Sequence, residues 1–193
     1  NKFLDGRVSE LWKTDGTVKG TTSTGVIFPM NDFVQLNFTV GKDAMYFAWQ
    51  DNNHGVEPWK TDGTQAGTKM IKDINQIFKN TGDTRSSEPK DFVNMNGTIY
   101  FTAKDDVYRS LWKTDGTEAG TLKVLDSKEE ISNLTNVNGV LFFVTPNAIW
   151  KSNGTTAGTV ILKSIGLPHE LINVNGKLFF AGDIYIKNNS AYG

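Results

Sequence analysis

The fold is decided by a stretch that recurs along the chain, Leu11-Trp12-Lys13-Thr14-Asp15-Gly16-Thr17. It returns with little change at 58–64 and 111–117, and in a looser form at 149–155. After two further residues, every copy continues into Gly-Thr. The tryptophans are spaced by 47, 53 and 38 residues, which predicts a repeated unit of about 40–50 residues with loops of variable length. One tryptophan marks each copy: Trp12, Trp59, Trp112 and Trp150.

A second motif precedes each of the later tryptophans. It consists of two short apolar runs joined by Asn-Gly and occurs at 92–101, 134–143 and 171–180, with a degenerate version at 33–47. Both central residues of a type I′ turn need a positive φ, which asparagine tolerates and glycine adopts freely. The motif therefore predicts a β-hairpin in every unit.

The tryptophan motif predicts a second hairpin in each unit. The aspartate carboxylate can accept hydrogen bonds from nearby backbone N–H groups, and the glycine after it supplies a left-handed residue. Each unit then has four short strands, and no segment shows the apolar spacing of a long helix. The predicted turn residues are Asp15, Asp62 and Asp115, with Gly16, Gly63, Gly116 and Gly154.

Four short antiparallel strands in a unit of this length are typical of a β-propeller blade. We therefore expect an all-β fold: a β-propeller-like array of four-stranded antiparallel blades within a single repeat region, 1–193. Complete units are predicted at about 33–74, 91–126 and 132–165, and partial units at 1–28 and 171–193. This division favours at least four blades and an excerpt from a larger propeller.

Recurring aromatic residues are expected to fill the space between neighbouring units. A residue repeated in register meets the same packing demand in every unit, so we favour packing over a ligand-stacking role for the tryptophans. The set comprises the four tryptophans together with Phe47, Phe101, Phe143 and Phe180.

Composition excludes several classes of function. The 193 residues carry a net charge of -1, which removes the electrostatic argument for a nucleic-acid partner. Absence of cysteine excludes disulfides, thiolate metal sites and a cysteine nucleophile. The longest apolar runs are too short to span a bilayer, so no membrane span is expected in this segment.

No metal or cofactor is expected. Calcium takes about 6–8 oxygen ligands, and one aspartate per turn supplies too few of them. His54 and His169 are the only histidines, and no third zinc ligand is spaced to join them. Nucleotide-binding glycine motifs and the G-x-S-x-G elbow are also absent, so no catalytic residue is predicted.

The stretch at 10–17, followed by Gly20-Thr21, resembles the ELWxTDGTxxGT (hyalin-like) repeat of secreted and cell-surface bacterial proteins. The approach to Trp59, at 51–58, is similar to the approach in that repeat. The resemblance covers nearly the whole chain. It implies an exported, propeller-like region without an agreed enzymatic activity, and it implies that His54 makes a structural hydrogen bond.

The candidate binding residues lie in loops that vary between units, because long insertions on a repeat array often form the binding surface. One such loop contains Asp51, Asn53 and His54. The long connection at 73–89 contains Arg85, and a third loop contains Tyr108 and Arg109. A tolerated surface insertion is the alternative interpretation of the long connection.

Three functions stay open. The first is a non-enzymatic, exported or cell-surface module that acts as a rigid scaffold for adhesion, assembly or protein–protein binding. The second is a glycan-binding propeller, in which exposed aromatic residues such as Trp49 or Tyr108 stack on sugars. The third is an enzyme carried on the propeller, for which the sequence shows no catalytic motif. The expected partner is therefore a protein or a glycan at the cell surface.

Overall fold

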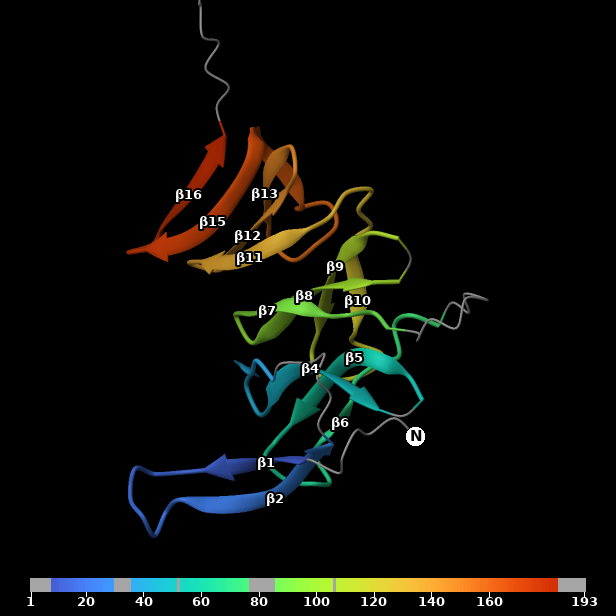
Figure 1. Cartoon of the computed structure of the whole chain (residues 1–193). Coiled ribbons are helices and arrows are strands. Elements are labelled where there is room, and N and C mark those ends of the chain that lie inside the picture. Colours follow the sequence, from blue (N-terminus) through green and yellow to red (C-terminus); the bar gives the residue numbers. More distant parts are fainter. Residues whose placement is uncertain (1–7, 30–35, 52, 77–85, 106, 184–193) are drawn as a thin grey trace, which may run out of the picture.

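The structure is a computed structural model that describes residues 8–29, 36–51, 53–76, 86–105 and 107–183. In these ranges every regular element is a β-strand, and the strands form five separate antiparallel sheets. Figure 1 shows the sheets following one another in chain order from one end of the molecule to the other. The predicted all-β class is thus confirmed. No closed ring of sheets is formed by the described residues, so the propeller arrangement stays a prediction.

In the part of the chain that the structure describes, three sheets have four strands in chain order and two have two strands. The N-terminal hairpin is β1 (Val8–Lys13) and β2 (Thr22–Pro29). Sheet I is β3 (Thr39–Val40), β4 (Met45–Asp51), β5 (Gly55–Thr61) and β6 (Lys69–Met70). Sheet II is β7 (Lys90–Met95), β8 (Thr98–Lys104), β9 (Arg109–Thr114) and β10 (Leu122–Leu125). Sheet III is β11 (Ser132–Val137), β12 (Val140–Thr145), β13 (Ala148–Ser152) and β14 (Val160–Ser164). The C-terminal hairpin is β15 (Gly166–Val174) and β16 (Lys177–Asp183).

The predicted Asn-Gly hairpins are present. Between β7 and β8, Asn96 and Gly97 have φ values of 55° and 85°. The equivalent pairs before β12 and β16 also have positive φ at both residues. Local sequence therefore fixes the first two strands of these units before any contact with a neighbouring unit is made.

Each four-stranded sheet pairs a phenylalanine of its second strand with the tryptophan of its third. Phe47 lies opposite Trp59 and Phe101 lies opposite Trp112, both across antiparallel strands. In sheet III, Phe143 lies opposite Trp150, and the two rings stack with centroids 5.7 Å apart. The three phenylalanines are fully buried, whereas Trp59 and Trp150 are half-buried.

Two of the aromatic residues predicted to pack between units are instead exposed. Trp12 is 57% exposed and Phe180 is 39% exposed. Each lies in a two-stranded hairpin. Among the described residues no neighbouring strand pairs with that hairpin to bring a phenylalanine opposite Trp12 or a tryptophan opposite Phe180. The prediction is wrong for this pair because burial in this repeat requires a complete sheet.

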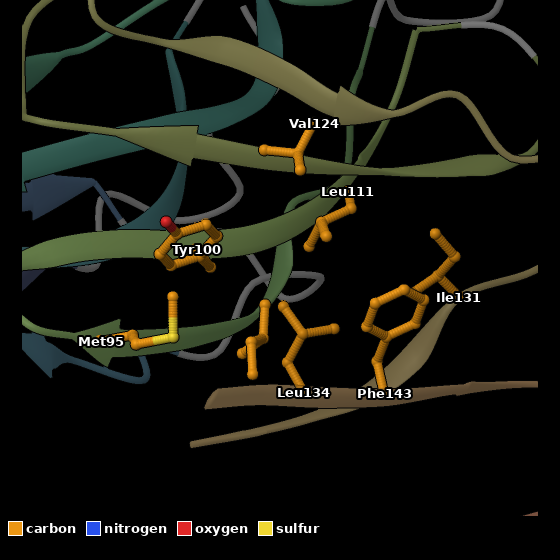
Figure 2. Packing of buried hydrophobic residues seen from close by; sticks show 8 residues of the cluster. Met95, Tyr100, Leu111, Val124, Ile131, Leu134 and Phe143 are labelled. Carbon is orange, nitrogen blue, oxygen red and sulfur yellow. The ribbon is translucent and has the colours of Figure 1, made fainter. Parts of the chain in front are cut away.

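The apolar core lies between consecutive sheets. Figure 2 shows Tyr100 and Leu111 of sheet II facing Leu134 and Phe143 of sheet III. A second core joins the N-terminal hairpin to sheet I, where Phe28 packs edge-on against Phe47 and Trp49. Trp49 is 5% exposed, which corrects its prediction as an exposed sugar-stacking residue. Burial of these side chains is the main apolar contribution to stability.

Asparagines connect the first strands of successive sheets through a repeated pair of hydrogen bonds. The Oδ1 atom of Asn136 accepts the N–H of Gly139 in its own turn, at 3.0 Å. Its Nδ2 atom donates to the carbonyl of Asn94 in sheet II, at 2.9 Å. Asn94 bonds the carbonyl of Val40 in the same way, at 2.8 Å. Asn173 bonds the carbonyl of Asn136, at 3.1 Å. We call this series the asparagine ladder.

Tyrosines make a second repeated contact between sheets. The hydroxyl of Tyr46 in sheet I lies against the turn glycine Gly116 of sheet II, where a Cβ atom would be 2.5 Å away. Tyr100 of sheet II lies against Gly154 of sheet III in the same manner. Both glycines also have φ near +87°, so this position excludes side chains for two separate reasons.

The described residues form no helix long and apolar enough to cross a membrane.

Replacing Trp112 with alanine should lower the free energy of unfolding by about 3–5 kcal/mol, because a buried indole is removed from its cluster with Phe101, Ala103 and Ile74. Trp12→Ala is the matched control. It removes the same repeated residue from an exposed site and should change stability by less than about 1 kcal/mol. Urea denaturation followed by circular dichroism measures both. Equal losses would remove Trp112 from the packing role.

Candidate functional site

The Asp-Gly-Thr turn is closed by its own side chains. Asp115 Oδ1 accepts hydrogen bonds from the N–H and the hydroxyl of Thr117, at 2.8 and 2.7 Å. The Thr117 hydroxyl in turn accepts the N–H of Gly120, at 2.9 Å. The hydroxyls of Thr114 and Thr121 join the two ends of the turn at 2.8 Å. The Thr117 hydroxyl and N–H hold the pKa of Asp115 below its ordinary value.

The other three copies of the turn make the same hydrogen bonds. The one copy without an aspartate shows which atom of that side chain the turn requires. Asn153 replaces the aspartate in sheet III, yet its Oδ1 atom still accepts both bonds from Thr155, at 3.0 and 2.8 Å. A single oxygen is therefore sufficient and the negative charge is not required. A side chain on Gly120 would overlap the Asp115 carboxylate, which accounts for the second recurring glycine. The predicted turn residues have a structural role.

The loop between β4 and β5 brings together three of the predicted binding residues. Asp51 Oδ1 accepts the N–H groups of Asn53 and His54, at 2.7 and 2.8 Å. Asp51 Oδ2 lies 2.7 Å from Nδ1 of the His54 ring. The His54 side chain is 34% exposed, so one edge of the ring faces solvent.

Charge and hydrogen bonding in this loop favour the ionised forms of both partners. Burial acts to raise the pKa of Asp51, but the N–H groups of Asn53 and His54 and the imidazole outweigh it and lower the pKa. The hydrogen bond to Asp51 raises the pKa of His54 above its ordinary value, against a smaller effect of burial. This is the structural hydrogen bond that the repeat resemblance implies for His54.

Glu57 is a buried carboxyl that is not among the site residues predicted from the sequence. It lies in β5 and is fully buried. Its Oε1 atom accepts the N–H of Ser87 at 2.9 Å, and its Oε2 atom accepts the N–H of Ile74 at 3.0 Å. The Ser87 hydroxyl also lies 2.6 Å from Oε2. Glu57 thus fastens both described ends of the long β6–β7 connection to the third strand of sheet I.

Burial governs the ionisation of Glu57. Removal of the carboxyl from water raises its pKa to about 7, although the three donors favour the charged form. The sequence does contain a signal for Glu57, because a glutamate recurs two residues before a tryptophan: Glu57 before Trp59 and Glu10 before Trp12. Glu10 accepts the hydroxyl of Ser23 at 2.5 Å in the exposed N-terminal hairpin, so sequence position alone does not reveal the burial of Glu57.

Arg109 is buried and bonded to acidic groups, which corrects its prediction as an available contact residue. Its side chain is only 4% exposed. Nη2 lies 2.9 Å from Glu88 Oε2, Nε lies 2.8 Å from Glu130 Oε1, and Nη1 donates to the Glu88 carbonyl. The neighbouring Tyr108 is 46% exposed and Val107 is 61% exposed. Arg109 therefore anchors a loop whose apolar tip faces solvent. Arg85, the remaining predicted contact residue, lies outside the described residues.

A polar cleft of about 410 Å³ lies between sheet I and the turn of sheet II. Three lysines and three aspartates line it, so the charges of its lining side chains are balanced in number. No group of three or more histidine, aspartate or glutamate side chains suited to a metal ion occurs in the described part of the chain. The charged residues of the cleft are Lys42, Asp43, Lys60, Asp62, Lys69 and Asp115.

Comparison with known proteins gave no match to a family model, to a curated protein or to a solved structure.

Replacing Glu57 with glutamine should remove a pH dependence of stability. The folded-state pKa of Glu57 is about 7, above its ordinary value of 4.5. Between pH 4.5 and 7 the folded state therefore keeps a proton on Glu57 that the unfolded state has lost. Stability from Glu57 is fully present below pH 4.5 and is lost as the pH rises through 7, a fall on the order of 3 kcal/mol.

Urea titrations of the wild type and of Glu57→Gln between pH 4.5 and 8 measure this difference. The variant should be less sensitive to rising pH, whatever constant offset the amide introduces. His54 titrates in both proteins, and Glu57 makes the smallest of the contributions that raise its pKa, so the effect of His54 largely cancels in the comparison. Parallel stability curves for the two proteins would show that Glu57 keeps its ordinary pKa.

Proposed function

We propose that the chain is a non-enzymatic, β-propeller-like scaffold of an exported bacterial protein, and that it holds binding loops in fixed positions. The resemblance to the ELWxTDGTxxGT repeat supports the exported, cell-surface location. The stacking of sheets I to III, each joined to the next through its first strand, supports the propeller-like arrangement. In propellers the blades repeat radially around a central channel.

The observation that carries the proposal is the loop between β8 and β9. Tyr108 and Val107 are exposed, directly before the buried Arg109. Glu88 precedes β7 and Glu130 precedes β11, so Arg109 ties the loop to the entries of two neighbouring sheets. An aromatic residue held on a fixed base loses little conformational entropy on binding, which is why tyrosine is common at binding hot spots.

Two further findings favour a scaffold over an enzyme. Glu57 has the raised pKa typical of a catalytic acid, but its carboxyl is fully buried and its oxygens are bonded to Ser87 and Ile74. A substrate therefore has no access to it. The aspartates of the repeated turns are likewise bonded to their own threonines, which leaves them a structural role.

Between a protein and a glycan partner, the structure favours a protein. Trp49 is buried against Phe28, so of the two aromatic residues considered for sugar stacking only Tyr108 is exposed. Its exposed neighbour is Val107, an aliphatic residue that suits the apolar centre of a protein interface better than a sugar face. We therefore place the contact surface at the tip of the β8–β9 loop.

Replacing Tyr108 with alanine should weaken partner binding by about tenfold or more without loss of stability, as expected for a hot-spot side chain. The immobilised chain is exposed to surface proteins of the bacterium that encodes it and, in parallel, to a glycan array. Val18→Ala is the matched control, because Val18 is 96% exposed on a turn remote from this loop.

Protein capture that Tyr108→Ala loses and Val18→Ala retains would support the proposal. Equal capture by both variants would remove Tyr108 from the contact surface. Binding to defined glycans that disappears in Tyr108→Ala would replace the protein partner with a sugar.

A further inference from the structure

The polar cleft between sheets I and II lies where sheet I departs from the repeat. Sheets II and III join their first two strands by a two-residue Asn-Gly turn, whereas β3 and β4 are joined by the longer segment 41–44. This segment contributes Lys42 and Asp43 to the cleft. In β6, Lys69 stands at the position that Leu122 occupies in sheet II. Parts of a repeat array that depart from the common pattern are where binding surfaces usually form.

A row of three side chains from paired strands lies on the cleft side of sheet I. Tyr46 of β4 is opposite Lys60 of β5, and Lys60 is opposite Lys69 of β6. Directly opposed residues share one face of a sheet, and Tyr46 reaches Gly116 of sheet II, so the whole row faces sheet II. Neither lysine forms an ion pair with another described residue. The row therefore offers two ammonium groups and a hydroxyl to a ligand.

The Tyr46 hydroxyl is the strongest sign that this cleft holds a ligand. Tyr46 is only 6% exposed, yet its hydroxyl makes no hydrogen bond to any described residue. It lies beside Nζ of Lys60, since a Cβ atom on Gly116 would be 2.5 Å from the hydroxyl and 3.2 Å from Nζ. Buried polar groups normally have a hydrogen-bond partner. A largely buried tyrosine that turns an unpartnered hydroxyl to a polar cleft is therefore suited to bind a polar group there.

The equivalent residues between sheets II and III are satisfied by the chain itself. Lys113, the counterpart of Lys60, donates to the carbonyl of Gly154 at 3.2 Å. Its neighbour on the next strand is the apolar Leu122. The turn it contacts carries the uncharged Asn153 in place of an aspartate. Free charges are thus a property of the cleft at sheet I and not of the repeat in general.

Carboxylates face the row from the turns. Asp62 and Asp115 use Oδ1 for the hydrogen bonds that hold their own turns, which leaves Oδ2 without a hydrogen bond to a described residue. Asp43 adds a third carboxylate from the segment 41–44. All three aspartates of the cleft therefore come from turns, whereas two of its three lysines come from strands. The cleft has a basic side and a mainly acidic side.

We propose that the cleft binds a small zwitterion, whose carboxylate contacts the Tyr46–Lys60–Lys69 row and whose ammonium contacts the turn aspartates. Hydrogen bonds to charged groups are stronger than neutral ones, and this ligand would form both kinds. A ligand of a single charge would meet as many repelling groups as attracting ones. The volume of about 410 Å³ is within the range of small-molecule sites and suits a short peptide with free ends.

This site is separate from the protein contact proposed above. Gly97, which precedes β8, lines the cleft. The loop that carries Tyr108 follows the other end of β8. The inference therefore goes beyond the proposed function and can be tested apart from it.

Titration with triglycine, followed by heteronuclear NMR, tests the site with a probe that carries one ammonium and one carboxylate. The amides of Gly67, Gly97 and Asp115 line the cleft and should shift in a saturable way. The expected Kd is on the order of 1 mM, as for other ligands of this size. N-acetyl-triglycine and triglycine amide each keep one charge, and both should bind about tenfold more weakly.

The repeat itself supplies conservative variants. Tyr46→Phe removes only the hydroxyl, and Asp115→Asn removes the charge but keeps the oxygen that is sufficient for the turn at Asn153. Each should weaken triglycine binding by about tenfold without loss of stability. The matched controls, Tyr100→Phe and Asp15→Asn, make the same changes at repeated positions that do not line the cleft, and should leave the affinity unchanged.

Loss of affinity in both cleft variants, with none in the controls, would support the proposal. Equal affinity for triglycine and N-acetyl-triglycine would overturn it, because the aspartates would then take no part in binding. An absence of saturable shifts at Gly67 and Gly97 would overturn it as well. Tyr108→Ala should bind triglycine as the wild type does, so failure of the zwitterion site and failure of the protein contact are distinguishable.

Discussion

The structure depends on the asparagine ladder, which connects each sheet to the one before it. Among the described residues, the first strand of each four-stranded sheet is an edge strand with no further strand paired to its outward side. Asn136 supplies a hydrogen-bond donor to the carbonyl of Asn94 in such a strand, while its own oxygen holds the Gly139 turn. One side chain therefore fixes a local turn and a contact between sheets together, which keeps neighbouring units in register.

The apolar contacts follow from this register. Once the first strands are aligned, Tyr46 and Tyr100 reach the turn glycines of the next sheet, and aliphatic residues such as Val124 meet the side chains opposite. The turn itself is held by its own hydroxyls and carboxylate, so it needs no contact from outside. A unit can thus form its turns alone but buries its aromatic residues only beside neighbours, in agreement with the general behaviour of repeat proteins.

The all-β class and the turns could be predicted from the sequence, because both depend on residues that are close together in the chain. Positive φ at Asn96 and Gly97 and the self-contained bonds of Asp115 are set by residues a few positions apart. The burial of Trp49 and Glu57 was not predictable in the same way. It depends on the N-terminal hairpin in one case and on the β6–β7 connection in the other, and no local pattern encodes either contact.

In the candidate site, too, contacts within one loop followed from the sequence, whereas contacts between distant residues did not. The sequence placed Asp51, Asn53 and His54 in one loop, and the structure adds the hydrogen bonds between Asp51 and the backbone and ring of His54. A binding role for this loop stays a prediction. Arg109 looked like a surface residue in a variable loop. Its partners, Glu88 and Glu130, are 21 residues away on either side. Glu88 precedes β7 of the same sheet, whereas the stacking of sheet III on sheet II brings Glu130 to Arg109. Tyr108 is left exposed as a consequence.

Amide hydrogen exchange on Asn136→Ala tests most directly whether the ladder couples the sheets, with Asn147→Ala, which loses one exposed amide bond to Glu129, as the control. Our account predicts faster exchange in both β11 and the neighbouring β7, because the same amide serves both sheets. Faster exchange confined to the β11–β12 turn would contradict it and would show that the sheets are held together by apolar packing alone.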